Sequence, residues 1–243
     1  MGQIAYRADT GEIVEAFSVS DLEWDALCNA QTGTVLMPRS KWPAVPKTSS
    51  RGLRFFAHNV GFSGNPPKPE SYAHTRLKID ILKAARSLGY TADLEVAGST
   101  PDGNQWIADV LVTLPNGNKT AFEVQLSSQH LNDFRLRTKR YRESSVKCCW
   151  IISEEPVGNH LRKAIFNENF EYNQAHIELQ VDDEDLLTFG VTLKDKSTYP
   201  DSCPTLRFGR GQEIRRMSLQ DAIDGFLKGC PIWRRPTWYW QAN

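Results

Sequence analysis

The sequence contains no apolar run that approaches the roughly 20 residues needed to cross a bilayer. Its first residues, MGQIAYRADTGEIVEAF, also lack the basic-then-apolar pattern of a secretory signal peptide. No segment repeats along the chain. These absences predict a protein of the cytoplasm that does not interact with a membrane.

Cysteine pairs with metal-binding or redox spacing are absent as well. None of the five cysteines forms a C-x-x-C pair with another, so neither a zinc site nor a redox pair is indicated. Cys148 and Cys149 are adjacent in KCCWIIS, which has the composition of a core strand. We therefore predict reduced, buried thiols and no disulfides.

The chain also lacks a net charge, because 29 lysines and arginines balance 29 aspartates and glutamates. The charges are nevertheless zoned. Residues 26–69 hold six basic residues and no acid, and residues 131–147 hold six basic residues against two acids. Such zones suit a polyanion bound on one face. Solvated helix faces show the same pattern, so the zoning alone leaves both interpretations open.

The 243 residues are enough for one large domain or two small ones, and a loop divides them. This loop, GFSGNPPKPE, holds two glycines and three prolines. Short strands in QIAYRA, EIVEAF and TVLMP predict a small β-rich module over residues 1–64. A core is predicted over 65–170. Residues 171–243 are predicted to complete or extend that core.

The order of elements in the core predicts an α/β fold. A helix is expected from about Glu70 to Leu88, followed by strands in ADLEVAG, QWIADVLVTL and KTAFEVQLS. A helix from about 128 to 143, the strand KCCWIIS and a helix near GNHLRKAIF come next. The tail offers strands in AHIELQV and LLTFGVTL and an amphipathic helix in SLQDAIDGFLKG. This order predicts a mixed central β-sheet flanked by helices.

Two strands joined by the turn PNGN carry polar groups on one face. Asp109 lies in the first strand, and Glu123 and Gln125 lie in the second. A tight hairpin would bring the two carboxylates together, where they would repel each other unless a cation lies between them. Carboxylate oxygens of this kind suit Mg²⁺ or Mn²⁺. Gln125 could orient a water or a phosphate oxygen.

The neighbouring helices add further polar groups. Glu70 and His74 lie on the apolar stripe of the first helix, and Lys78 is adjacent to it. Arg137 and Tyr141 are one turn apart on the next helix. Ser127 and Ser128 are predicted to cap that helix, so that its positive end would point at Glu123 and Gln125.

Each of these residues also has a purely structural interpretation. Asp109 could be satisfied by turn amides, and Glu123 with Gln125 could face solvent on an edge strand. Glu70 could complement a helix N-terminus, and His74 could be a hydrogen-bonded helix residue. Order and spacing taken jointly favour a nuclease-like site.

Asp109, followed after thirteen residues by Glu123-Val124-Gln125, resembles the D…E-x-K signature of the PD-(D/E)xK nucleases, with Gln125 in the lysine position. Together, PESYAHTRLK, IADVLV and AFEVQLSSQHLNDFRLRTKRYRESSVKCCWII resemble the competence protein CoiA-like family. The resemblance implies a Mg²⁺-dependent deoxyribonuclease whose metal ligands are Asp109, Glu123, the Val124 carbonyl and Glu70. Glu70, Asp109, Glu123 and Gln125 would be its catalytic residues. The DNA contacts that the zoning and the resemblance predict are His74, Lys78, Arg135, Arg137, Lys139, Arg140 and Tyr141.

The family also carries a C-x-x-C pair and a later HFAH in a small zinc-ribbon-like module. Here Cys28 is present, but Gln31 stands where the second cysteine would be. RFFAH keeps His58 and has Phe55 in place of the first histidine. Two remaining ligands are too few for a structural zinc, so we predict a degenerate module held by its core.

Two functions of different class follow. The first is a metal-dependent DNA phosphodiester hydrolase, an endonuclease or exonuclease, acting in DNA recombination, in uptake during competence, or in antiviral defence. The second is a catalytically weak or inactive DNA-binding accessory factor that docks a recombinase or another DNA-processing partner. A homo-oligomer is compatible with either function.

Overall fold

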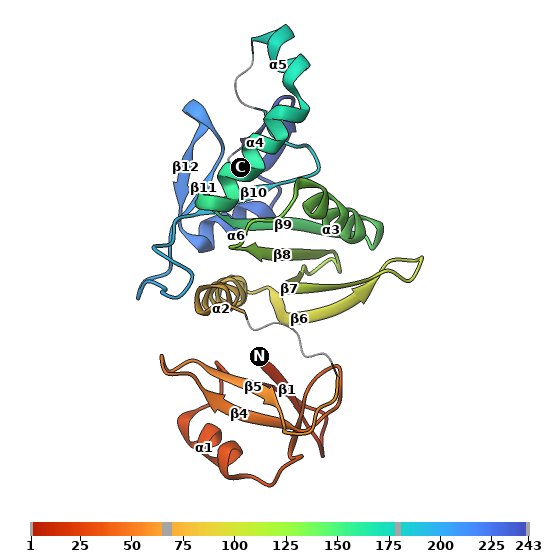
Figure 1. Ribbon diagram of the computed structural model, residues 1–243, viewed down its shortest axis with the longest axis vertical. Coiled ribbons are helices and arrows are strands. Elements are labelled where there is room, and N and C mark those ends of the chain that lie inside the picture. Colours follow the sequence, from red (N-terminus) through yellow and green to blue (C-terminus); the bar gives the residue numbers. More distant parts are fainter. Residues whose placement is uncertain (1, 65–69, 178–180, 242–243) are drawn as a thin grey trace. The chain divides into compact units, whose positions relative to one another are not determined.

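The computed structural model describes residues 2–64, 70–177 and 181–241 (Figure 1). The chain divides into two compact units, Met1–Ser71 and Tyr72–Asn243. The predicted dividing loop includes residues 65–69, which lie outside the described residues. Among the described helices, none is long and apolar enough to pass through a membrane.

The first unit is small and rich in β-structure, as predicted. It consists of a three-stranded sheet, a hairpin and one helix. The sheet holds β1 (Ile4–Arg7), β2 (Ile13–Glu15) and β3 (Val35–Leu36), the hairpin holds β4 (Ala44–Thr48) and β5 (Arg54–His58), and the helix is α1 (Asp21–Asn29). α1 was not predicted. Its signal is Ser20, whose side chain accepts a hydrogen bond from the Glu23 amide.

Cys28 and His58, the two candidate zinc ligands that remain in this unit, lie in different environments. Cys28 is exposed on α1. The Nε2 atom of His58 lies 3.1 Å from the Ser40 hydroxyl, and its ring stacks on Phe62. The core of the unit is a cluster of buried hydrophobic residues in which Trp24 packs on Phe56. Apolar packing therefore holds this unit together.

The second unit is built on a seven-stranded mixed sheet in the order β12-β11-β10-β9-β8-β7-β6. Strands β8, β9 and β10 are parallel, and the other neighbours are antiparallel. The strands are β6 (Thr91–Ser99), β7 (Gln105–Thr113), β8 (Lys119–Gln125), β9 (Val146–Ser153), β10 (Thr188–Val191), β11 (Leu206–Phe208) and β12 (Arg215–Met217). This sheet confirms the predicted fold class.

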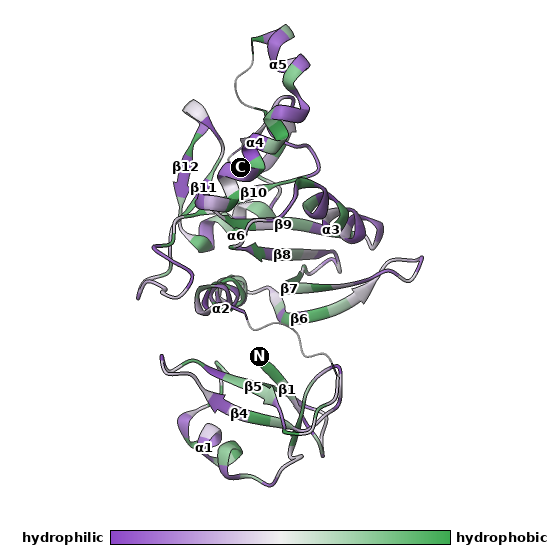
Figure 2. Ribbon diagram, viewed as in Figure 1, coloured by the Kyte–Doolittle hydropathy of each residue, from purple (hydrophilic) through white to green (hydrophobic). Residues whose placement is uncertain are grey.

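Helices cover both faces of the sheet (Figure 1). α2 (Tyr72–Ser87) packs on β6, β7, β8 and α6 (Leu219–Leu227), whereas α3 (Leu131–Glu143) packs on β9 and on α4 (Asn159–Glu168). α3 is largely hydrophilic in Figure 2, in keeping with its many charged residues. The remaining elements are a turn of helix at Glu154–Gly158, α5 (Phe170–His176), a short helix at Gly211–Glu213, and a hairpin of β13 (Pro231–Arg234) and β14 (Thr237–Trp240).

The alternation along β8 decides which side chains meet which helix. Phe122 contacts Phe226 of α6, with ring centroids 5.6 Å apart. Ala121 instead belongs to a buried cluster with Tyr141 of α3. Because alternate residues of a strand point to opposite faces, Glu123 and Gln125 lie on the α3 face.

Two predicted elements differ from the structure. α3 begins at Leu131, not near Ser128, and its N-cap residue makes no side-chain capping bond. The serine hydroxyls have tertiary partners instead, because Ser128 bonds His160 and Ser127 accepts from Lys196. The strand predicted in AHIELQV is also wrong where the chain is described, since residues 175 and 176 belong to α5; residues 178–180 lie outside the described residues.

Candidate functional site

Three carboxylates lie in a row across three neighbouring strands. The ladder between β6 and β7 is interrupted between the pairs Leu94–Val110 and Val96–Ala108, which is the position of Glu95 and Asp109. The pairing of β7 with β8 ends at Val110 and Phe122, which are the sequence neighbours of Asp109 and Glu123. The ladder therefore stops where the acids begin, and their side chains enter the space between β7 and β8.

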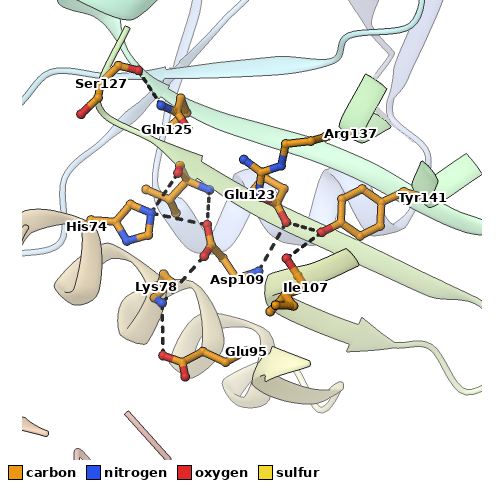
Figure 3. Close-up of polar contacts among 11 residues, drawn as sticks. His74, Lys78, Glu95, Ile107, Asp109, Glu123, Gln125, Ser127, Arg137 and Tyr141 are labelled. Atoms are coloured by element: carbon orange, nitrogen blue, oxygen red, sulfur yellow. Dashed lines mark hydrogen bonds and ion pairs between the residues drawn. The ribbon is translucent and has the colours of Figure 1, made fainter. Parts of the chain in front are cut away.

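Asp109 takes over the hydrogen bonding at this break (Figure 3). Its Oδ2 atom accepts the Val124 amide at 2.9 Å, and the Nε2 atom of His74 lies 3.5 Å from the same oxygen. His74 Nε2 is also 3.0 Å from the Val124 carbonyl oxygen. On the other side, the Lys78 ammonium lies 3.7 Å from Oδ1. Groups from α2 and β8 thus surround a carboxylate of β7.

These contacts keep Asp109 ionised. Burial alone would raise the pKa of its carboxyl. The hydrogen bond with His74, the charges of Lys78 and His74 and the Val124 amide outweigh burial and lower the pKa from 3.8 to about 2. Asp109 is therefore negative at neutral pH.

Lys78 has no exposed side-chain surface and lies between two acids. Its Nζ atom is 3.4 Å from Glu95 Oε1 and 3.7 Å from Asp109 Oδ1. Glu95 has a φ of +55°, which is uncommon for a residue with a side chain. Because the Lys78 side chain has no exposed surface, it does not fit the prediction that it contacts DNA. Its ammonium group instead lies beside the carboxylates of Glu95 and Asp109. Glu95 was missed, although it interrupts the strand ADLEVAG with an acid.

Glu123 is fully buried and faces α3. Its Oε2 atom contacts the Arg137 guanidinium, and its Oε1 atom contacts the Tyr141 hydroxyl. The Asp109 amide is 3.4 Å from Oε1. Arg137 also lies over the Trp150 ring, 5.0 Å from its centroid. The two carboxylates of the predicted pair therefore have separate sets of partners.

The surroundings of Glu123 favour its protonated form. Burial and the charge of Asp109 raise the pKa of this carboxyl from 4.5 to about 7, although Arg137 and Tyr141 oppose the change. The hydrogen bonds agree, because the Tyr141 hydroxyl is also 3.0 Å from the Ile107 carbonyl oxygen. A single hydroxyl proton serves only one of these acceptors, and a protonated Glu123 would donate to Tyr141. Burial keeps the tyrosine itself neutral by raising its pKa.

Gln125 ends β8, and its amide nitrogen donates to the Ser127 carbonyl. Lys196 approaches from a later loop and donates to the Ser127 hydroxyl at 2.8 Å. The backbone carbonyl of Lys196 accepts a hydrogen bond from the Ala73 amide at the start of α2. Lys196 was not predicted as a site residue, and no sequence signal marks it, because only the fold returns this loop to the site.

The donor atoms around Asp109 fit a divalent cation. The Asp109 carboxylate, the His74 imidazole and the Val124 carbonyl converge within hydrogen-bonding distances. One ligand atom each from Glu70, His74 and Asp109 lie within 4.8 Å of one another. Glu70 is separated from α2 by a single residue. The oxygen ligands of this set suit Mg²⁺ and Mn²⁺.

The predicted DNA contacts on α3 have different surroundings. Arg137 and Tyr141 contact Glu123, as described above. Arg135 forms ion pairs with Glu168 and Asp183. Lys139 and Arg140 are exposed on α3, and their contact with DNA stays a prediction.

The helix, three strands, helix and strand from α2 to β9, with acids at the break between β7 and β8, define a nuclease-like α/β core. Residues 70–199 match the family described as competence protein CoiA, nuclease-like domain, and this match covers more than half of the chain. The chain belongs to this family. A search of curated proteins gave no match.

Proposed function

We propose that this protein is a metal-dependent DNA phosphodiester hydrolase whose reaction centre is Asp109. The observation that carries the proposal is the ionised Asp109 carboxylate, which shares its surroundings with His74 and the Val124 carbonyl at the break between β7 and β8. The family match and a donor set suited to a divalent cation support the same conclusion.

The cation ligands would be Asp109, the Val124 carbonyl, His74 and Glu70. A divalent ion bound there would polarise a phosphate oxygen and offset the charge that develops during hydrolysis. In the structure, the His74 Nε2 atom lies near both the Val124 carbonyl and Asp109 Oδ2. His74 thus holds these two oxygens in place, and it must give up its proton on Nε2 to become a ligand itself.

Lys78 and Gln125 divide the work that a single lysine does in the D…E-x-K pattern. Lys78 supplies a buried positive charge beside Asp109 and keeps that carboxylate ionised. Gln125 is half-buried at the carboxyl end of β8 and orients a water or a phosphate oxygen once its amide turns from Ser127. Charge and orientation then come from two elements, α2 and β8.

Cleavage of plasmid, branched and single-stranded DNA by the purified protein, with Mg²⁺, Mn²⁺ or EDTA, tests the proposal. Cleavage should need the metal and should be lost in Asp109→Asn. Asp102→Asn is the matched control, because Asp102 is exposed at the turn between β6 and β7. Cleavage that persists in Asp109→Asn would refute the proposed centre.

One observation favours the accessory-factor function as a second candidate. Arg137 and Tyr141 hold Glu123 away from the other ligands, in a form that burial tends to protonate. A protein that keeps this arrangement would bind DNA without cutting it. Binding without cleavage in every metal would establish this second function and exclude the first.

A further inference from the structure

A cavity with three arginines lies outside the Asp109 site, at the carboxyl ends of β9 and β10. Arg162 comes from α4, and Arg207 and Arg210 come from β11 and the residues after it. Ile152 and Gly190 form part of its floor. Nothing in the proposed hydrolysis uses these arginines.

The three guanidinium groups are close enough to repel one another. Burial and the charge of Arg207 lower the pKa of Arg162. Burial, together with the charges of Arg162 and Arg207, lowers the pKa of Arg210 even though Asp182 opposes this. Like charges held together inside a protein are costly unless an anion accompanies them.

Three carboxylates also line the cavity, but they are shared with other groups or lie beyond hydrogen-bonding distance. Asp182 contacts Arg210, but it also accepts bonds from the Thr237 hydroxyl and the Trp238 amide. Glu154 lies 3.6 Å from Arg207, beyond hydrogen-bonding distance.

Arg162 differs from the other two arginines. Its guanidinium contacts the Asn159 side chain, and within the described part of the chain it forms no ion pair with a carboxylate. Asp183 also lines the cavity, but its carboxylate is bound to Arg135. Each guanidinium carries five N–H donors, which is more than these contacts of Arg162, Arg207 and Arg210 use, so donors remain for a ligand in the cavity.

The size of the cavity limits the ligand. Its volume is about 50 Å³, a few times the roughly 10–15 Å³ that one water molecule requires. A tetrahedral oxyanion fits this space, and any group attached to it must lie outside. A terminal phosphate has one such attachment, whereas an internal phosphodiester has two.

The position of the cavity suits a ligand shared with the Asp109 site. In the sheet, Gln125 pairs with Ile152, and Ile152 pairs with Gly190. Two strand spacings therefore separate the end of β8 from the cavity, on the order of 10 Å. Ligands of open α/β sheets bind at this edge, outside the carboxyl ends of parallel strands.

We infer that Arg162, Arg207 and Arg210 form a binding pocket for a phosphomonoester, the terminal phosphate of a nucleic-acid strand or of a free nucleotide. The guanidinium groups donate charge-assisted hydrogen bonds to the phosphate oxygens, and the rest of the ligand extends through the opening of the cavity. This assignment does not depend on hydrolysis at Asp109.

The test is calorimetric titration of the full chain in EDTA, where no metal-dependent cleavage occurs. The ligands are inorganic phosphate, a nucleoside 5′-monophosphate, and one single-stranded oligonucleotide with a 5′-phosphate, a 3′-phosphate or no terminal phosphate. A terminal phosphate should tighten binding of the oligonucleotide by about tenfold. A phosphorylated oligonucleotide that binds more tightly than the nucleotide identifies a strand end as the ligand, and equal affinities identify the nucleotide.

Arg162→Gln should abolish the advantage of the terminal phosphate. Lys163→Gln is the matched control, because it removes the same charge from the next residue of α4, which is exposed. Thermal melting of each variant shows whether it is folded, and Arg207→Gln serves as the second variant if Arg162→Gln is not. Equal affinity of the phosphorylated and unphosphorylated oligonucleotides for the wild-type protein would overturn the inference. An undiminished advantage in the folded variant would do so as well.

Discussion

The two sides of the break between β7 and β8 treat their carboxylates in opposite ways. On the α2 side, Asp109 is held ionised by Lys78, by His74 and by a backbone amide. On the α3 side, Glu123 is fully buried, and burial raises its pKa even though it contacts Arg137. The pKa values of two acids at neighbouring positions of one hairpin are thus shifted in opposite directions, because helices on opposite faces of the sheet supply their partners.

The difference suggests a division of labour. Asp109 is already ionised, so it can bind a cation without losing a proton. Glu123 would have to leave its contacts with Arg137 and Tyr141 to reach a cation, and its raised pKa opposes the loss of its proton. The roles of Asp109 and Glu123 can be distinguished by substituting each acid, or its partners, one at a time.

Loss of Asp109 should have the largest effect. Asp109→Asn removes the carboxylate charge that contacts both His74 and the Val124 amide. Metal-dependent cleavage should fall by about a thousandfold. Initial rates of cleavage at saturating Mn²⁺ measure this loss, with Asp102→Asn as the control. A fall of less than tenfold would mean that the reaction centre lies elsewhere.

Removal of Lys78 should destabilise the fold. Lys78→Met leaves Glu95 and Asp109 without their buried counter-charge, and such a loss costs about 3–4 kcal/mol. Urea unfolding at pH 7 measures the change in the free energy of unfolding. Lys163→Met, at an exposed position of α4, should change it by a few tenths of a kcal/mol at most. Equal stabilities of the two variants would show that the buried ammonium does not support the acids.

The raised pKa of Glu123 should make stability depend on pH. Between pH 4.5 and 7 the folded protein binds a proton here that the unfolded chain releases, so this contribution is complete below pH 4.5 and is lost as pH rises through 7. The loss amounts to about 3 kcal/mol. Glu123→Gln removes it, so the variant should gain stability relative to wild type between pH 5 and pH 8.

Urea unfolding of metal-free wild type and Glu123→Gln at pH 5, 6, 7 and 8 measures this relative gain. Glu171→Gln is the control, since Glu171 is exposed on α5. If the stability curves of wild type and Glu123→Gln run parallel, Glu123 is ionised over the whole range, and the contrast with Asp109 disappears.

The smallest effect should come from the Tyr141 hydroxyl. Tyr141→Phe removes the hydrogen bonds to Ile107 and Glu123 but leaves the ring packed, which should cost about 1 kcal/mol. Tyr90→Phe is a suitable control, because within the described residues the Tyr90 hydroxyl has no hydrogen-bond partner. Urea unfolding compares the two variants. If Tyr141→Phe increases cleavage while it lowers stability, the hydroxyl restrains Glu123.

Much of the fold could be predicted because its signals are local. The alternation in KTAFEVQ, the turn PNGN and the apolar run in KCCWIIS each mark a strand, and β7, β8 and β9 lie where these signals are. The start of α3 could not be predicted in this way. Ser127 and Ser128 have the composition of a cap, but Lys196 and His160 bind their hydroxyls, and both partners are distant in sequence.

The candidate site could also be predicted only as far as its signals are local. The hairpin order that brings Asp109 and Glu123 to neighbouring positions is visible in the chain, since strand alternation and turn chemistry act over a few residues. The burial of Lys78 between Glu95 and Asp109 and the contacts of Glu123 with Arg137 and Tyr141 depend on which helix packs on which face. Local sequence determined which acids are present and in what order. Only the tertiary structure decided in which direction the pKa of each acid is shifted, because burial and the charged partners come from segments that are distant in sequence.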